Sequence, residues 1–136
     1  MGDTTTQQVE QQTTMYDWIG GEQGLRKLVD RFYHLMDTEE QAKTIRAMHK
    51  DDLSDIRSGL FEYLSGWLGG PPLFIMKHGS PCISTQHRPF VIDQQASDAW
   101  MFCMKKAMLD VGIDKQYQEM LTPAFQRMCN TLINAH

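Results

Sequence analysis

The chain has 136 residues, enough for one domain with a single hydrophobic core. Hydrophobic residues make up 41% and charged residues 22% of it, as in ordinary soluble globular proteins. The net charge of −4, with no basic stripe, argues against nucleic acid or an anionic membrane surface as a partner. No apolar run is long enough to span a bilayer, and we see no secretory signal. The three cysteines include no Cys-x-x-Cys pair, so we expect a cytoplasmic protein without a disulfide framework.

The N-terminal third begins with a tail and continues with helices. Residues 1–14 are rich in Thr and Gln, which predicts a disordered tail ahead of a domain over residues 15–136. A short helical lead over 15–19 is closed by two glycines, and apolar residues at helical spacing then predict a helix over 22–36. The run Thr-Glu-Glu-Gln at 38–41 matches a capping box and predicts a short helix that ends near Met48.

The rest of the chain predicts three longer segments of helix and one irregular stretch. A third helix, capped by Asp51 or Asp52, ends at the Gly-Gly-Pro-Pro run that begins at Gly69. Residues 71–86 contain three prolines and show no period, so we expect a long loop there. Asp93 opens a strongly amphipathic helix, and the last helix contains Pro123, where we expect a kink or a broken start. With no strand signal, the predicted class is all-α.

His87 lies in the run Gln-His-Arg-Pro-Phe, where the loop gives way to the helix that begins at Asp93. A neutral imidazole held at such a junction is a candidate axial ligand for a haem iron. Trp100, thirteen residues further on, can direct an indole N–H over the same pocket as a hydrogen-bond donor. Tyr33 and His49 are two further polar groups, on a helical apolar stripe or just past one.

These residues resemble those of the group II truncated haemoglobins, over the chain from about Tyr16 to the C-terminus. The resemblance is strongest in the His-x-Pro-Phe motif at His87 and in the run Asp-Ala-Trp that ends at Trp100. The paired glycines at 20–21 and 69–70 also resemble the family's glycine motifs. The resemblance implies two antiparallel helix pairs in a two-over-two sandwich around haem b, with a long loop before the proximal histidine.

The resemblance also assigns roles to individual residues. His87 matches the proximal iron ligand, and Tyr33, His49 and Trp100 match positions that hydrogen-bond the ligand on the distal side. Ile56 appears where ordinary globins place a distal histidine. The other candidates for cofactor binding supply either an apolar wall or cations for the haem propionates. The apolar candidates, with Ile56, are Leu60, Leu64, Phe74, Ile83, Phe90 and Ile92, with Met104 as a further one. The candidates for the propionates are Lys77, His78 and Arg88, with Arg57 as a further one.

Each polar candidate has a purely structural alternative. Tyr33 also fits the edge of a core with its hydroxyl in water, and Trp100 also fits an ordinary core position. His49 precedes a Lys-Asp-Asp run, so a solvated loop histidine is the alternative there. The cations proposed for the propionates equally fit a solvated surface.

The function that the resemblance implies is binding of dioxygen, nitric oxide and carbon monoxide at a five-coordinate haem iron. Tight distal hydrogen bonding suits chemistry or scavenging of dioxygen, nitric oxide or peroxide more than bulk oxygen transport, with nitric oxide dioxygenase or peroxidase-like activity as hypotheses. Because no Gly-x-Gly-x-x-Gly motif is present, any reductase is a separate protein. The alternative is a haem-free helical module that binds a protein or a small ligand, and haem content distinguishes the two. Both a monomer and a homodimer remain open.

Overall fold

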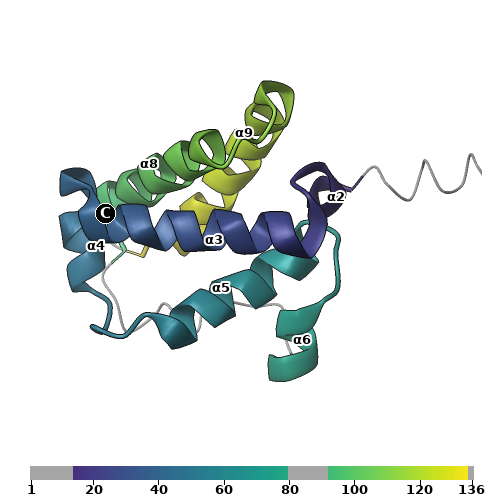
Figure 1. Ribbon diagram of the computed structural model, residues 1–136. Helices are drawn as coiled ribbons and strands as arrows, with labels where there is room; N and C mark the ends of the chain where they lie inside the picture. Colours follow the sequence, from purple (N-terminus) through teal and green to yellow (C-terminus); the bar gives the residue numbers. More distant parts are fainter. Residues whose placement is uncertain (1–13, 80–91, 135–136) are drawn as a thin grey trace, which may run out of the picture.

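The computed structural model describes residues 14–79 and 92–134, and this part of the chain consists of helices without a strand, as predicted (Figure 1). None of the helices in these two ranges has both the length and the apolar character needed to cross a bilayer. The elements in chain order are α2 (Met15–Trp18), α3 (Gly21–Thr38), the 3-10 helix η1 (Glu40–Ala42), α4 (Lys43–Ala47), α5 (Ser54–Trp67), α6 (Leu73–His78), α8 (Gln94–Asp110) and α9 (Lys115–Leu132).

Helix α3 is the central element, because it packs against both α5 and α8, while α8 pairs with α9 (Figure 1). Such a position requires apolar side chains over a wide sector of the helix surface. The sequence supplies them at helical spacing, and the buried residues of α3 are Leu25, Leu28, Val29, Phe32, Tyr33, Leu35 and Met36. Helix α3 therefore joins the α5 side of the molecule to the α8–α9 side.

The short helix α2 links three other elements at one end of the molecule. The Tyr16 N–H donates to the Leu68 carbonyl at the end of α5, at 2.9 Å. The Trp18 ring stacks on Tyr117 of α9, with ring centroids 5.1 Å apart. Where α2 meets α3 the backbones approach so closely that a Cβ on Gly24 would lie 1.7 Å from the Ile19 carbonyl oxygen. Glycine at position 24 is therefore a packing requirement.

Two of the predicted helix starts differ in how well they match the structure. The Asp93 side chain accepts a hydrogen bond from the Ala96 N–H at 2.8 Å, so the predicted N-cap of α8 is confirmed. The predicted capping box at Thr38 is wrong. Residue 38 still belongs to α3, and its hydroxyl donates back to the His34 carbonyl at 3.0 Å instead of capping the next helix.

Residues 73–78 form α6, so the prediction of an irregular segment is wrong for this part of 71–86; residues 80–86 lie outside the described ranges. Two prolines precede the helix, a position where the missing proline N–H removes no helical hydrogen bond. The Phe74 ring anchors α6 on α5 by an edge contact with Tyr63 at 5.5 Å. The predicted break in the last helix is also absent, because α9 continues through Pro123.

Alanine substitutions at two helical glycines distinguish the effect of helix propensity on stability from the effect of close backbone packing. We expect Gly59→Ala in α5 to stabilise the protein by about 0.5–1 kcal/mol, because nothing lies within 4 Å of the new Cβ. We expect Gly24→Ala in α3 to destabilise it by about 2 kcal/mol, since the Ile19 backbone must move. Urea unfolding of the two variants measures both effects. Equal stabilities would show that the close approach of α2 to α3 is not required.

Candidate functional site

The structure brings together three of the polar residues that the sequence singles out, although they come from separate elements. Tyr33 lies in α3, His49 follows α4, and Trp100 lies in α8. The buried ring of Phe32 joins two of them, with its centroid 5.0 Å from that of Tyr33 and 5.0 Å from that of Trp100. The His49 ring stands edge-on to Tyr33 with centroids 6.5 Å apart. The three side chains and Phe32 therefore form one connected group, in which His49 contacts Tyr33, and Phe32 contacts Tyr33 and Trp100.

The Tyr33 phenol is a buried donor with a weak internal partner. The residue is only 5% exposed, which excludes the alternative of a hydroxyl in bulk water. Its hydroxyl donates to the Ile56 carbonyl at 3.4 Å, which is long for an O–H···O hydrogen bond. Burial raises the pKa of the phenol far above its usual value, with a smaller opposing effect from the Arg57 charge. Tyr33 therefore stays protonated. Because its hydrogen bond to Ile56 is weak, the hydroxyl can donate to a closer acceptor instead with little loss of hydrogen-bond energy.

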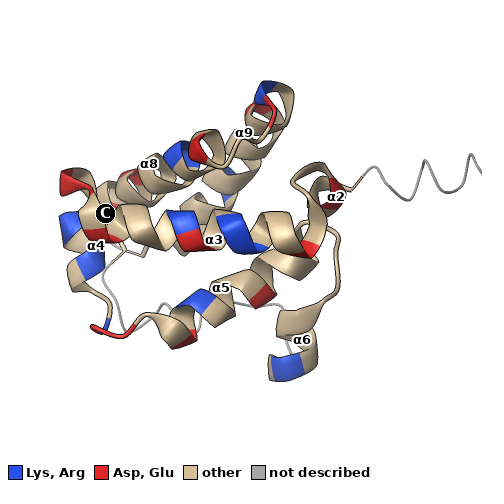
Figure 2. Ribbon diagram, in the orientation of Figure 1, with Lys and Arg blue, Asp and Glu red and all other residues tan. Residues whose placement is uncertain are grey.

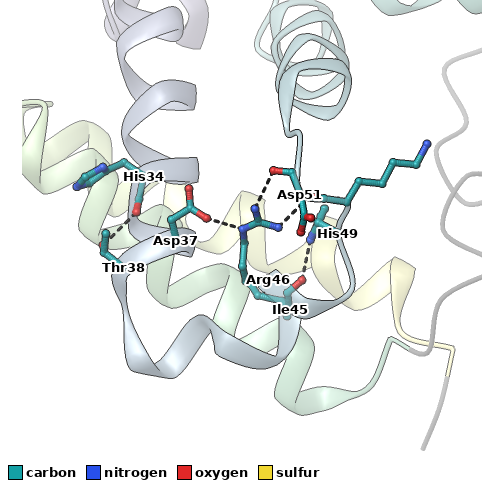
Figure 3. Close-up of polar contacts among 8 residues, drawn as sticks. His34, Asp37, Thr38, Ile45, Arg46, His49 and Asp51 are labelled. Carbon is teal, nitrogen blue, oxygen red and sulfur yellow. Dashed lines mark hydrogen bonds and ion pairs between the residues drawn. The ribbon is translucent and has the colours of Figure 1, made fainter.

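His49 is held by the backbone of α4, as Figure 3 shows. Its N–H donates to the Arg46 carbonyl at 3.0 Å, and its ring Nδ1 lies 2.6 Å from the Ile45 carbonyl oxygen. The side chain is half-buried. These contacts orient the His49 ring beside Tyr33, so they exclude the alternative of a solvated loop histidine.

The Trp100 indole is half-buried and lies between two other rings. Its centroid is 5.0 Å from that of Phe32 and 5.7 Å from that of Phe125, which in turn stacks on Trp67 of α5 at 5.0 Å. The indole N–H of this half-buried ring can only donate a hydrogen bond, so the group that satisfies it must be an acceptor.

Several predicted apolar contacts lie on the elements around this cluster. Ile56 and Leu60 of α5 and Ile92 ahead of α8 are partly buried and pack against the core. Leu64 and Met104 are fully buried within the core itself. Phe74 is also buried, but it lies in α6, where its ring contacts Tyr63 in the C-terminal half of α5.

The described cations that were candidates for propionate contacts have partners within the protein. Lys77 of α6 pairs with Glu62 at 3.5 Å, and Arg57 of α5 pairs with Asp30 at 3.8 Å. The His78 ring lies against Phe74 at 4.4 Å. Figure 2 shows that acidic and basic residues are intermixed along α3 and α5, so the visible face carries no block of one sign.

The other predicted site residues lie outside the described ranges, and their placement stays a prediction. They are the candidate proximal ligand His87 together with Ile83, Arg88 and Phe90.

Sequence reasoning missed Arg46, which connects α3, α4 and the segment 48–53 that leads to α5. Its guanidinium contacts the Asp37 carboxylate and donates to the carbonyls of Lys50 at 3.0 Å and Asp51 at 3.1 Å (Figure 3). No sequence motif marks this residue, because two of its three acceptors are backbone groups.

Comparison with known proteins identifies the family. The family model described as "Bacterial-like globin" matches residues 14–134. The chain belongs to the bacterial-like globins. It is a group II truncated, two-on-two haemoglobin, as the resemblance in the sequence predicted.

Three solved structures of this class are similar over nearly the whole chain. The cold-adapted truncated haemoglobin of the Antarctic marine bacterium Pseudoalteromonas haloplanktis TAC125 is 43% identical, with a TM-score of 0.87 over 91% of this chain and 100% of that one. The group II two-on-two haemoglobin of Agrobacterium tumefaciens is 35% identical, with a TM-score of 0.86 over 91% and 96%. The truncated oxygen-avid haemoglobin of Bacillus subtilis is 34% identical, with a TM-score of 0.79 over 90% and 100%.

Membership of the globin family implies a haem cofactor and binding of ligands to it. The described residues of this globin fit such a group chemically. Partly exposed apolar side chains at Ile56, Leu60 and Ile92 suit the faces and edges of a porphyrin, and Tyr33, His49 and Trp100 supply polar groups for a ligand. Because α5 and α8 make no extensive contact in the described part of the chain, α3 is the element that holds these two helices in place.

The buried Tyr33 phenol gives the globin a characteristic response to alkali. Folding raises its pKa from the ordinary value of 10.0, so above pH 10 the unfolded chain loses a proton that the folded chain retains. The stability contributed by this group is complete below pH 10, and above it the free energy of unfolding falls by up to about 1.4 kcal/mol per pH unit. We expect Tyr33→Phe to remove this part of the slope in urea unfolding between pH 7 and pH 11.

The thiols of Cys103 and Cys129 contribute a slope of the same sign, because burial raises their pKa values to about 11 and about 12. They are unchanged in the variant, so the difference between variant and parent isolates Tyr33. Tyr117→Phe, at a half-buried ring stacked on Trp18, is the matched control. Parallel slopes in Tyr33→Phe and the parent would contradict the assignment.

Proposed function

We propose that this globin carries haem b with His87 as the proximal iron ligand and binds dioxygen and other diatomic ligands beside Tyr33, His49 and Trp100. When bound, the haem would supply the iron that takes up the diatomic ligand. The observation that supports this proposal is the convergence of Tyr33, His49 and Trp100 from α3, the segment after α4, and α8. The residues of the chain orient the ligand and exclude water from it.

Among the three polar residues, we assign the strongest effect on ligand release to Tyr33, which acts as a hydrogen-bond donor. Its hydroxyl is protonated and buried. Its hydrogen bond to the Ile56 carbonyl is long, at 3.4 Å, so a shorter hydrogen bond to a ligand can replace it. A preorganised donor in a site of low polarity stabilises a ligand that gains negative charge, which slows ligand release. The B. subtilis protein named above is described as oxygen-avid, and we propose the same property for this chain.

Slow release suits reaction or scavenging more than bulk transport of oxygen. We therefore propose that the globin acts on dioxygen, nitric oxide or peroxide. A separate reductase restores the reduced iron, because the chain has no nucleotide-binding glycine motif of the form Gly-x-Gly-x-x-Gly.

Absorption spectra test the haem assignment and the role of His87. We expect haemin to bind in stoichiometric amount and to give a sharp Soret band that shifts when carbon monoxide is added to the dithionite-reduced protein. We expect His87→Ala to lose or alter this band, because the imidazole is the iron ligand. His34→Ala, at an exposed position of α3, is the control. Spectra of the His87 variant that match the parent would overturn the assignment.

The rate of dioxygen release tests the role of Tyr33. We expect Tyr33→Phe to speed release by about 10- to 100-fold, the loss of a hydrogen bond to a charged acceptor of about 1.5–3 kcal/mol. Stopped-flow displacement of dioxygen by carbon monoxide measures it, with Tyr117→Phe as control. Release at the parent rate in Tyr33→Phe would remove Tyr33 from the set of ligand donors.

A further inference from the structure

A cavity that none of Tyr33, His49 and Trp100 lines is present at the end of the molecule where α2 lies. Its volume is about 310 Å³, and its walls are residues 18–20, one face of the first two turns of α3, and the turn 111–114 that joins α8 to α9. Figure 1 shows this turn at the same end of the molecule as α2. We call it the corner cavity. Its volume is at the lower end of the range for sites that bind small molecules.

Glycines form part of the cavity wall and leave its space unfilled. Gly24 has no room for a side chain, because a Cβ there would lie 1.7 Å from the Ile19 carbonyl oxygen. Gly112 has a φ of +81°, a left-handed conformation that favours glycine. Both positions are therefore restricted to glycine by the backbone, and the chemistry of the cavity depends on the side chains around them.

Two opposite charges face the cavity from different walls. Lys27 belongs to α3 and Asp114 to the turn 111–114, and these are the charged residues among those that line the cavity. Within residues 14–79 and 92–134, neither the Lys27 ammonium nor the Asp114 carboxylate takes part in an ion pair or hydrogen bond, with each other or with another residue. Both charges are therefore available to a ligand.

The position of Asp114 makes its lack of a partner informative. It is the N-cap residue of α9, where an aspartate side chain commonly accepts a hydrogen bond from the first turn of the helix. Here the carboxylate makes no such bond, and the N–H groups of Tyr117 and Gln118 donate to the Asp114 backbone carbonyl instead, each at 3.0 Å. The carboxylate is therefore not required to begin the helix.

Apolar groups complete the lining. The half-buried ring of Trp18 is fixed by its stack on Tyr117, with centroids 5.1 Å apart. Ile19, Val111 and Ile113 also line the cavity. The cavity thus combines an aromatic and aliphatic lining with one cation and one anion.

This combination selects the charge of the ligand. A ligand with only a negative charge is attracted by Lys27 and repelled by Asp114, and a simple amine meets the reverse. A zwitterion satisfies both residues when its ammonium group lies toward Asp114 and its carboxylate toward Lys27. An α-amino acid with an apolar side chain carries these two charges and matches the apolar part of the lining.

We propose that the corner cavity binds a free α-amino acid with an apolar side chain, held between Asp114 and Lys27. The bound ligand connects the start of α3 to the turn between α8 and α9. This inference goes beyond the proposed function and does not depend on it, because no residue of the cavity belongs to the group that contains Tyr33, His49 and Trp100.

Titration with L-leucine and two matched analogues tests the proposal. Isocaproate is leucine without its ammonium group, and isopentylamine is leucine without its carboxylate. We expect leucine to cause saturable shifts of the Trp18 indole N–H and the Gly112 amide in proton–nitrogen NMR spectra of the reduced, carbon monoxide-bound holoprotein. Each analogue should bind about fivefold more weakly, the effect of one exposed ion pair. No saturable shift with leucine, or equal affinity for an analogue, would overturn the proposal.

Substitutions at the two charged residues assign the contacts. We expect Asp114→Asn to lower leucine affinity about fivefold and not to lower isocaproate affinity, because isocaproate has no ammonium group. Lys27→Gln should lower leucine affinity by a similar factor and should not lower isopentylamine affinity. Lys115→Gln is the control, since this exposed lysine follows Asp114 but does not line the cavity. A loss in the control as large as in the other two variants would refute the assigned contacts.

The outcomes separate this inference from the proposed function. Failure of the chain to take up haem would refute the proposed function, and the same titration of the purified full-length chain would still decide whether the corner cavity binds leucine. Normal haem uptake without leucine binding would refute the amino-acid site alone.

Discussion

The double contact of α3 is the constraint on which the rest of the molecule depends. One helix packs on α5 and on α8, and its fully buried Phe32 contacts both Tyr33 of its own helix and Trp100 of α8. Protein interiors are packed as densely as organic crystals, so a change of side-chain volume at Phe32 displaces both neighbours. The separation between Tyr33 and Trp100 is therefore set by the core of α3 and not by a contact between these two side chains.

Elements whose sequence signal is local were predicted well. The apolar spacing of α3 and the Asp93 cap of α8 concern residues within one or two turns of each other, and the structure reproduces both. The errors arose where one local signal competed with another. Thr38 carries a capping-box pattern, but its hydroxyl is satisfied inside α3 by the His34 carbonyl. Prolines 71 and 72 suggested a loop, whereas they precede the first turn of α6, where proline is compatible with a helix.

The candidate site was likewise predictable in part. The family resemblance was sufficient to predict that Tyr33, His49 and Trp100 lie near one another, and the structure brings their rings together. The sequence did not indicate which acceptors the cations select, so the pairing of Lys77 with Glu62 and of Arg57 with Asp30 emerged only from the fold. Arg46 was missed for a related reason. Two of its partners are main-chain carbonyls, which every residue has, and only the path of the backbone decides which of them a guanidinium reaches.

The placement of α2 has a consequence for how this globin can be joined to other proteins. Helix α2 lies at one end of α3 and α4 lies at the other (Figure 1), and the 18 residues of α3 separate them by about 27 Å at the helical rise per residue. Hydrogen bonding of Tyr16 to Leu68 and stacking of Trp18 on Tyr117 fix α2 at that end. A domain fused directly to α2 would therefore join the molecule at the end opposite to α4 and His49.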